Sequence, residues 1–162
     1  MDWSPVLISV KTALVSIGFT FFLGLWAARI VVRLKSAKAK GLIDGIFTLP
    51  MALPPTVAGF FLLYIFGTKR PVGILLQQVF SCKIVFTWQA AVIAAVVISF
   101  PLMYRSARGA IEQVDQNLVY AARTFGMKER TIFWKVIFPE AKPGILAGGI
   151  LAFTRGLGEF GA

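Results

Sequence analysis

Long apolar stretches separated by short polar segments dominate this chain. No charged residue occurs from Thr12 to Ala28, from Gly45 to Thr68 or from Ile84 to Tyr104, and a fourth stretch runs from Pro143 to Thr154 before Arg155 interrupts it. A transmembrane helix needs about 20 mostly apolar residues. The first three stretches meet this length, and the fourth does if it continues to the end of the printed sequence. None alternates like a strand, and backbone in lipid must bond within its own chain. The pattern therefore predicts an all-α, polytopic membrane protein with about four spans.

Composition agrees with a membrane protein. Hydrophobic residues make up 57% of the 162 residues, whereas soluble domains contain about 45–50%. The 17 basic residues outnumber the 7 acidic ones, but they lie beside the apolar stretches, and no basic stripe interleaves with stacking aromatics. We therefore expect no nucleic-acid partner. No repeat or flexible linker divides the chain, so we expect one domain over residues 1–162.

The positions of Lys and Arg predict the topology. Basic residues gather between the first and second stretches and between the third and fourth, at Arg33, Lys35, Lys38, Lys40, Arg105, Arg108, Arg123, Lys128, Arg130, Lys135 and Lys142. Loops rich in Lys and Arg lie on the cytoplasmic side. We therefore expect a multi-pass protein of the cytoplasmic (inner) membrane, surrounded by lipid, with its N-terminus outside.

The cytoplasmic segment from Asp115 to Pro139 is polar but patterned. Asp115 or Asn117 is a candidate N-cap for a short helix, and Gly126 suits a left-handed helix end. A second helical run from Lys128 to Ile137 is expected next, and Pro139 predicts a bend before the last span. The residues alone leave two interpretations open: an amphipathic connector lying on the bilayer, or a helix-turn-helix on which another protein docks.

The segment resembles the cytoplasmic signature loop of ABC importer permeases, Glu-Ala-Ala-x3-Gly-x9-Ile-x-Leu-Pro. Ala121, Ala122, Gly126 and Pro139 match it, whereas Tyr120, Val136 and Phe138 stand where the pattern has Glu, Ile and Leu. In that family the loop docks into a cleft of the ATP-hydrolysing subunit. The resemblance thus implies a coupling loop that includes Tyr120, Ala121, Ala122, Arg123, Gly126 and Pro139. It also implies that no salt bridge to the ATPase starts from position 120.

Further stretches are similar to the molybdate-type permeases of this family. They are Leu49–Phe60, with the run Leu-Pro-Pro-Thr-Val-Ala-Gly, Ser99–Arg108, and the closing Phe153–Ala162, with Gly-Glu-Phe-Gly-Ala. Sulfate permeases share the closing motif and the loop. The resemblance implies a type I ABC importer fold and import of a tetrahedral oxyanion, molybdate or tungstate, with sulfate or thiosulfate as the alternative. Such permeases continue past this point, so we expect the chain to lack one or more C-terminal spans.

The same resemblance implies the partners: a second copy of the permease, ABC ATPase subunits and an extracytoplasmic oxyanion-binding protein. The sequence has no Gly-x-x-x-x-Gly-Lys-Ser/Thr phosphate loop, so we expect ATP on the partner subunit and no cofactor on this chain. There is no histidine, one cysteine and no paired carboxylates. No catalytic or metal site is therefore expected, which argues against the alternative of a membrane enzyme. A scaffold or channel without an ATPase stays a further alternative.

Two sets of residues are candidates for the translocation path. Prolines inside a span free backbone groups, which transporters place at substrate sites. The first set lies in the second stretch and comprises Pro50, Pro54, Pro55, Thr56 and Gly59. The second comprises Arg155 and Glu159, four residues apart and so on one helix face. A plain structural kink and an interfacial ion pair are the respective alternatives.

Overall fold

Helices form every regular element in the part of the chain that the structure describes. The computed structural model describes residues 3–66 and 88–158. Its elements are α1 (Ser4–Arg33), α2 (Ala37–Ala52), α3 (Pro55–Phe66), α5 (Trp88–Glu112), α6 (Gln116–Thr124), α7 (Glu129–Ile132), a π turn (Phe133–Ile137) and α8 (Phe138–Gly158). The predicted all-α class is confirmed.

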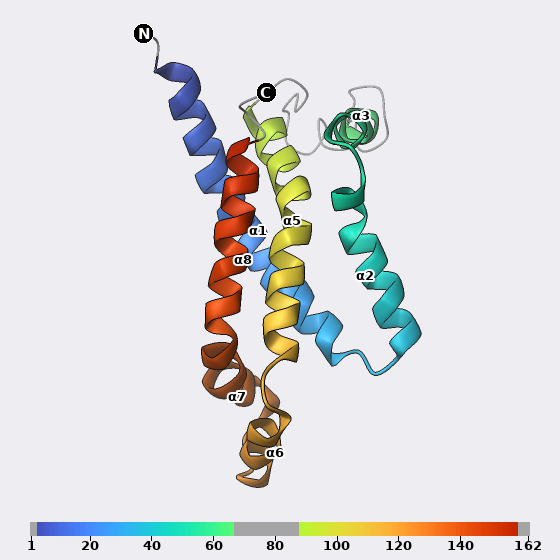
Figure 1. Ribbon diagram of the computed structural model, residues 1–162, viewed down its shortest axis with the longest axis vertical. Coiled ribbons are helices and arrows are strands. Elements are labelled where there is room, and N and C mark those ends of the chain that lie inside the picture. The colour runs from blue at the N-terminus through green and yellow to red at the C-terminus, as the bar shows by residue number, and fades with distance from the viewer. Residues whose placement is uncertain (1–2, 67–87, 159–162) are drawn as a thin grey trace, which may run out of the picture.

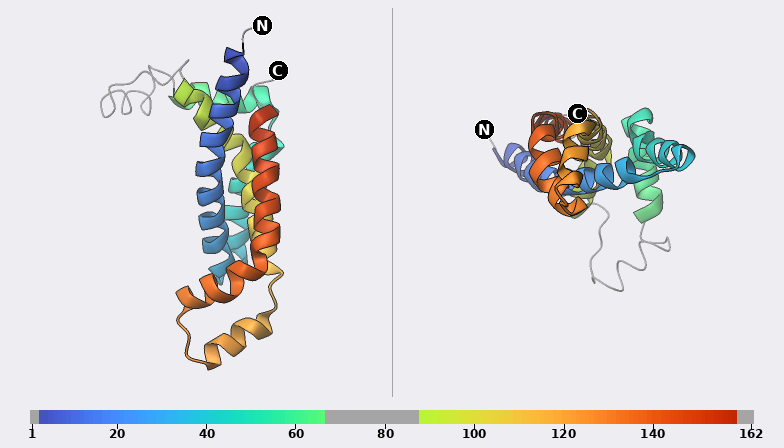
Figure 2. Two further views of the ribbon diagram at one scale, coloured as in Figure 1. Left: turned by 90° about the vertical axis from the view of Figure 1, so that its left-hand side faces the viewer. Right: turned by 90° about the horizontal axis from the view of Figure 1, so that it is seen from below.

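Three upright helices, α1, α5 and α8, form the body of the molecule (Figures 1 and 2). Within the described residues, three helical segments are long and apolar enough to cross a membrane: Val6–Arg33, Trp88–Glu112 and Glu129–Gly158. They correspond to the first, third and fourth predicted spans. The last begins earlier than the apolar stretch suggests, because α7 and the π turn lead into α8 without a break in helical structure.

Small residues let these three helices approach closely. A Cβ built on Gly24 of α1 would lie 2.7 Å from the Met103 side chain of α5, and one on Gly148 of α8 would lie 2.5 Å from Ser106 Cβ. Membrane helices associate mainly through such close packing, because lipid tails are as apolar as the side chains they replace. The glycines therefore let α1 and α8 each pack closely against α5.

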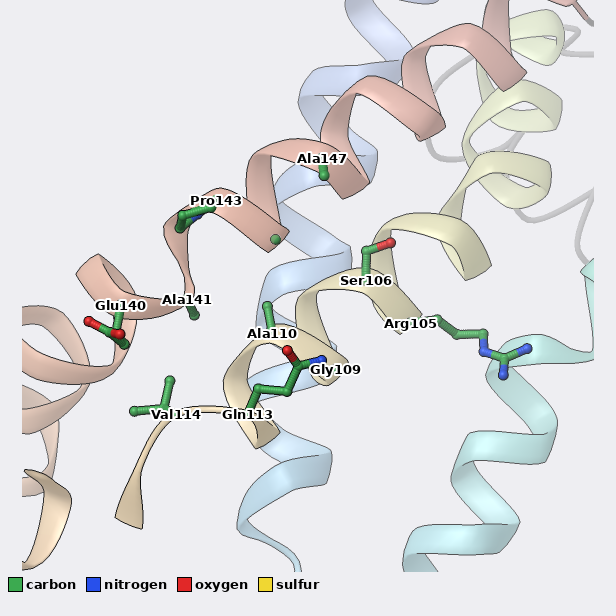
Figure 3. A pocket seen from close by; sticks show the side chains of 11 residues that line it. Arg105, Ser106, Gly109, Ala110, Gln113, Val114, Glu140, Ala141, Pro143 and Ala147 are labelled. Atoms are coloured by element: carbon green, nitrogen blue, oxygen red, sulfur yellow. The ribbon is translucent and has the colours of Figure 1, made fainter. Parts of the chain in front are cut away.

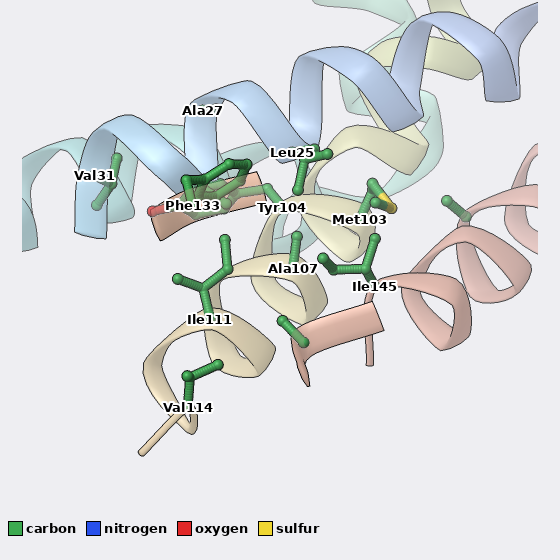
Figure 4. Packing of buried hydrophobic residues seen from close by; sticks show 13 residues of the cluster. Leu25, Ala27, Val31, Met103, Tyr104, Ala107, Ile111, Val114, Phe133 and Ile145 are labelled. Carbon is green, nitrogen blue, oxygen red and sulfur yellow. The ribbon is translucent and has the colours of Figure 1, made fainter. Parts of the chain in front are cut away.

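The main buried cluster lies in the half of the bundle nearest α6 and α7. Figure 4 shows Tyr104 and Met103 of α5 between Leu25 and Val31 of α1 and Ile145 of α8. Tyr104 and Met103 are both fully buried. Phe133 of the π turn belongs to the same cluster. The polar segment from Asp115 to Pro139 is therefore packed against the bundle core through this residue.

The second predicted span is not one straight helix. It divides into α2 and α3 around Leu53, whose φ of −84° and ψ of 141° are extended. The residue before a proline is driven out of helical conformation, and here two prolines follow one another. Pro55 then suits the first turn of α3. Figure 1 shows α2 rising beside α5 while α3, seen end-on, lies across the far end.

Candidate functional site

The segment from Asp115 to Pro139, here called the coupling loop, folds as the predicted helix-turn-helix. A side-chain oxygen of Asp115 accepts from the amide of Asn117 at 2.9 Å and caps α6. Gly126 has a φ of 71°, a left-handed conformation that costs glycine little. Met127 N–H bonds to Ala122 O and Gly126 N–H to Arg123 O, which is the Schellman arrangement for ending a helix.

The two helices of the coupling loop pack on a small apolar core of their own. Val119 and Ala122 of α6 and Ile132 of α7 are buried together, with Met127 packed against them. The two alanines of the signature thus differ: Ala122 is only 6% exposed, whereas Ala121 faces outward. Of the two, only Ala121 is accessible to a second surface.

An ion pair fastens the outer side of the turn. Arg123 Nε donates to Glu129 Oε1 at 2.8 Å, which links the end of α6 to the start of α7. This hydrogen bond raises the pKa of the Arg123 guanidinium. The guanidinium also lies 5.9 Å from the Tyr120 ring centroid. Arg123 therefore stabilises the shape of the loop in addition to contributing positive charge to its surface.

The coupling loop presents apolar side chains to the outside. Leu118 is 47%, Tyr120 57% and Phe125 83% exposed. Large aromatic groups left exposed on a short, fixed helix are typical of surfaces that bind another protein. The side chain that stands in place of the signature glutamate, Tyr120, is therefore suited to aromatic and apolar contacts.

Pro139 is the second residue of α8, and helical structure continues through it. Figure 2 shows α7 lying across the lower end of the bundle while α8 rises steeply from it. Proline offers no N–H to the turn before it. The Phe138 N–H bonds to Phe133 O, five residues back, and closes a π turn. The change of direction between α7 and α8 is thus accompanied by a π turn, which the sequence did not indicate.

A hydrogen-bonded group that sequence reasoning missed ties α2 to the base of α5. Lys40 Nζ lies 2.7 Å from Glu112 Oε1, and Arg108 pairs with both Asp44 and Glu112. The hydroxyl of Tyr104 donates to Asp44 Oδ1 at 2.9 Å. The sequence did hold a signal, because Tyr104, Arg108 and Glu112 are each four residues apart, as are Lys40 and Asp44.

The candidate path residues fall into two separate places. Pro50 is half-buried and lines an apolar groove of 260 Å³ together with Phe47 and Phe100. Thr56 is exposed and lies after the break between α2 and α3. Pro54 is exposed and Gly59 half-buried, while Pro55 begins α3. Arg155 is exposed in the last turn of α8. Figures 1 and 2 show α5 between the two places. Glu159, the expected partner of Arg155, lies outside the described residues.

A second, larger groove of 570 Å³ runs between α5 and α8 near the coupling loop. Figure 3 shows Arg105, Ser106 and Gln113 of α5 and Glu140 and Pro143 of α8 along it. Its walls combine these polar side chains with small apolar residues. Among the described residues, no group of three or more His, Cys, Asp and Glu side chains could hold a metal ion.

Comparison with known proteins agrees with this architecture. Residues 20–162 match the family model described as binding-protein-dependent transport system inner membrane component. The molybdenum transport system permease protein ModB of Escherichia coli K12 is 41% identical over 99% of this chain and 70% of its own length. ModB of Haemophilus influenzae is 37% identical over all of this chain and 70% of its own length.

Two further relatives broaden the comparison. The sulfate transport system permease protein CysT of Salmonella typhimurium LT2 is 35% identical over 96% of this chain and 55% of its own length. A solved structure of the MetNI methionine ABC transporter in an inward-facing conformation superposes with a TM-score of 0.75 at 20% identity, covering 95% of this chain and 68% of that one. The fold is therefore that of an ABC importer permease. The chain belongs to the family of binding-protein-dependent transport system inner membrane components, the membrane-spanning subunits of ABC importers.

Proposed function

We propose that this chain is the permease subunit of an ATP-driven importer of molybdate or tungstate, working as a pair of copies with two ATPase subunits and an extracytoplasmic binding protein. The observation that carries the proposal is the coupling loop: a capped, ion-paired helix-turn-helix at one end of the bundle, with exposed aromatic side chains. ATP is bound and hydrolysed on the partner subunit, and no cofactor is bound by this chain.

The connections of the coupling loop suit it to transmit force. Only residues 113–115 separate α5 from α6, while α7 continues through the π turn into α8. A displacement of α6 would therefore act on α5 and α8, which pack directly on each other and on α1. Closure of the ATPase pair on ATP would move both helices together and change the side of the membrane to which the path opens.

The distribution of basic residues supports one orientation of the protein in the membrane. The basic link between α1 and α2 and the coupling loop lie toward the same end of the bundle, with the start of α1 at the other (Figure 1). Under the positive-inside rule that end is cytoplasmic, so the N-terminus is outside. In this arrangement α2 and α3 together make the second passage, with α3 lying across the outer end.

Two observations support a second copy. Helix α2 has no buried residue, and Leu42, Ile46 and Leu49 along it are more than half exposed. The two candidate path regions, around Pro54 and around Arg155, lie on different sides of α5. A two-fold pair brings surfaces of this kind together across one axis, where they would line a shared path for a dianion.

Transport by the full-length protein, reconstituted in vesicles with its ATPase and binding protein, tests the proposal. We expect ATP-dependent uptake of molybdate that tungstate inhibits and that excess sulfate leaves unchanged. Sulfate uptake that molybdate does not inhibit would favour the alternative suggested by the CysT relatives. Failure of any ATPase subunit to copurify with the protein would contradict the assignment as a whole.

The path residues are tested separately by cysteine scanning. In a Cys82→Ser background, cysteines at Thr56 and Gly59 should react with a water-soluble thiol reagent in at least one transport state. A cysteine at Phe19, an exposed apolar position on α1, is the unreactive control. Uniform protection of Thr56 and Gly59 in every state would remove α3 from the path, and normal transport by Arg155→Gln would remove Arg155.

A further inference from the structure

A groove on the outside of the bundle is lined by residues of α1 and of the π turn. It has a volume of 350 Å³ and lies between α1 and the π turn, lined chiefly by Phe22, Trp26, Arg29, Phe133 and Trp134. Phe22 is 73%, Trp26 65% and Trp134 48% exposed. Arg29 is the one charged residue of this lining. The groove therefore combines an aromatic wall with a single cation.

The Arg29 side chain is held in place without an anionic partner. Its guanidinium carbon lies 4.0 Å from the Phe133 ring centroid, which fixes the group by a cation–π contact. Its Nε is buried and has no hydrogen-bond partner, and no carboxylate in the described ranges forms an ion pair with it. A buried guanidinium nitrogen without a partner is unfavourable unless a ligand compensates elsewhere on the group.

Two further cations surround this site. Arg33 and Arg130 lie close enough for their charges to act on Arg29. The nearby acid Glu129 also interacts with Arg33, but its carboxylate is already paired with Arg123 at 2.8 Å. The three arginines thus form a positive cluster in which, among the described residues, none is joined to a carboxylate by an ion pair.

The arginine cluster lies near the C-terminal end of α1, where the apolar stretch of this helix ends. Arg29 is four residues from the end of α1 at Arg33, on the side of the molecule that carries the coupling loop. One face of α1 carries Phe22, Trp26 and Arg29, which are separated by four and three residues. This face runs from the apolar stretch to the arginine cluster. Tryptophans mark the level of lipid headgroups, and the cytoplasmic leaflet is rich in anionic lipids.

We propose that this groove binds an anionic phospholipid of the cytoplasmic leaflet. The planar guanidinium of Arg29, with Arg33 and Arg130 beside it, takes the phosphate of the headgroup, and an acyl chain lies along Phe22 and Trp26. An amphiphile fits better than a free anion, because the cations adjoin an exposed apolar strip. The site is separate from the proposed transport path and does not depend on the identity of the transported substrate.

Tryptophan quenching tests the site. The full-length protein carrying Trp3→Phe and Trp88→Phe would retain Trp26 and Trp134 of the four tryptophans of the printed chain. It would be reconstituted with brominated phosphatidylglycerol or brominated phosphatidylcholine at equal mole fraction. We expect stronger quenching by phosphatidylglycerol. Arg29→Gln should lower that preference about fivefold, the effect of one cation near an anionic surface. Lys38→Gln removes the same charge on the same side but outside the groove, and should leave the preference unchanged.

Other results would overturn the proposal. Equal quenching by both lipids, or equal effects of Arg29→Gln and Lys38→Gln, would reduce the site to general surface attraction. Absence of quenching by either lipid would mean that protein, such as a second copy, covers the groove. Loss of the preference on adding inorganic phosphate would identify a site for a soluble anion. If Arg29→Gln does not fold, Arg130→Gln, at an exposed position, tests the same cluster.

Discussion

The ammonium group of Lys40 lies 2.7 Å from the carboxylate of Glu112, so the first turn of α2 is joined to the last turn of α5. Glu112 is followed within three residues by Asp115, which caps α6. The helix that carries the broken proline segment is therefore attached at the point from which the coupling loop leaves the bundle. A displacement of the loop would therefore act on α2 through this joint as well as through α5 itself.

Removing one charge from this joint should weaken the attachment of α2. Asp44→Asn takes the carboxylate away from Arg108 and Tyr104. We expect a loss of about 1 kcal/mol in the free energy of unfolding, less than a buried charged hydrogen bond contributes, because the Asp44 side chain is 36% exposed. Thermal unfolding in detergent measures it. Asp115→Asn is the matched control, because Asn caps a helix as well as Asp does. Equal midpoints for the two variants would show that the joint adds no stability.

Close packing of α8 on α5 should make Gly148 intolerant of a side chain. A Cβ there would meet Ser106 Cβ at 2.5 Å, so Gly148→Ala should cost about 1–3 kcal/mol through overpacking. Gly18→Ala is the control, because nothing lies within 4 Å of a Cβ at that position. It should be neutral or slightly stabilising, since alanine favours helix over glycine. A Gly148→Ala protein with an unchanged thermal midpoint would contradict the close approach of α5 and α8.

The left-handed turn at Gly126 should set the angle between α6 and α7. Gly126→Ala forces a Cβ onto a φ of 71°, which costs about 1–2 kcal/mol. We expect weaker copurification of the ATPase subunit together with a lower thermal midpoint. Gly126→Asn should be milder, because Asn tolerates this region better than Ala does. The same loss for both substitutions would mean that something other than the backbone conformation limits this position.

Exposed aromatic groups on the coupling loop should contribute to docking. Phe125→Ala removes a ring that is 83% exposed and touches no described core, so the permease itself should keep its stability. Affinity for the ATPase subunit should fall by about 30-fold if Phe125 is a central contact. Binding of purified subunits measures the change. Leu146→Ala, at an exposed apolar position on α8, is the control. Equal affinities for both variants would place the docking contact elsewhere on the loop.

Local signals in the sequence were enough for the helices and for the turn. The charge-free stretches located α1, α5 and α8 because a span has to be apolar along about 20 residues. Asp115 and Gly126 located the ends of α6 because capping depends on the residue itself. The coupling loop was thus predictable in outline before its packing was known.

Features that depend on neighbouring helices were not predictable in this way. Prolines in the second stretch indicated a kink, but not that α3 would lie across the end of α2 (Figure 1). The inward direction of Ala122 depends on Ile132, ten residues later. The joint at Asp44 involves Tyr104, sixty residues away. Sequence spacing shows which residues share a helix face, but not which helix that face meets.

The π turn before Pro139 has a consequence for rotation. A π turn holds one residue more than the α-helical turn it replaces. If that extra residue moved out of the π turn, the preceding segment, which includes α7, would rotate by about 100° relative to α8. The reason is that an α-helix makes a full revolution about every 3.6 residues. One of the neighbouring residues Phe133 and Trp134 would then take the direction in which the other points now, and α7 would turn with them. The extra residue of the π turn would thus allow α7 to rotate relative to α8 while the chain stays helical at their junction.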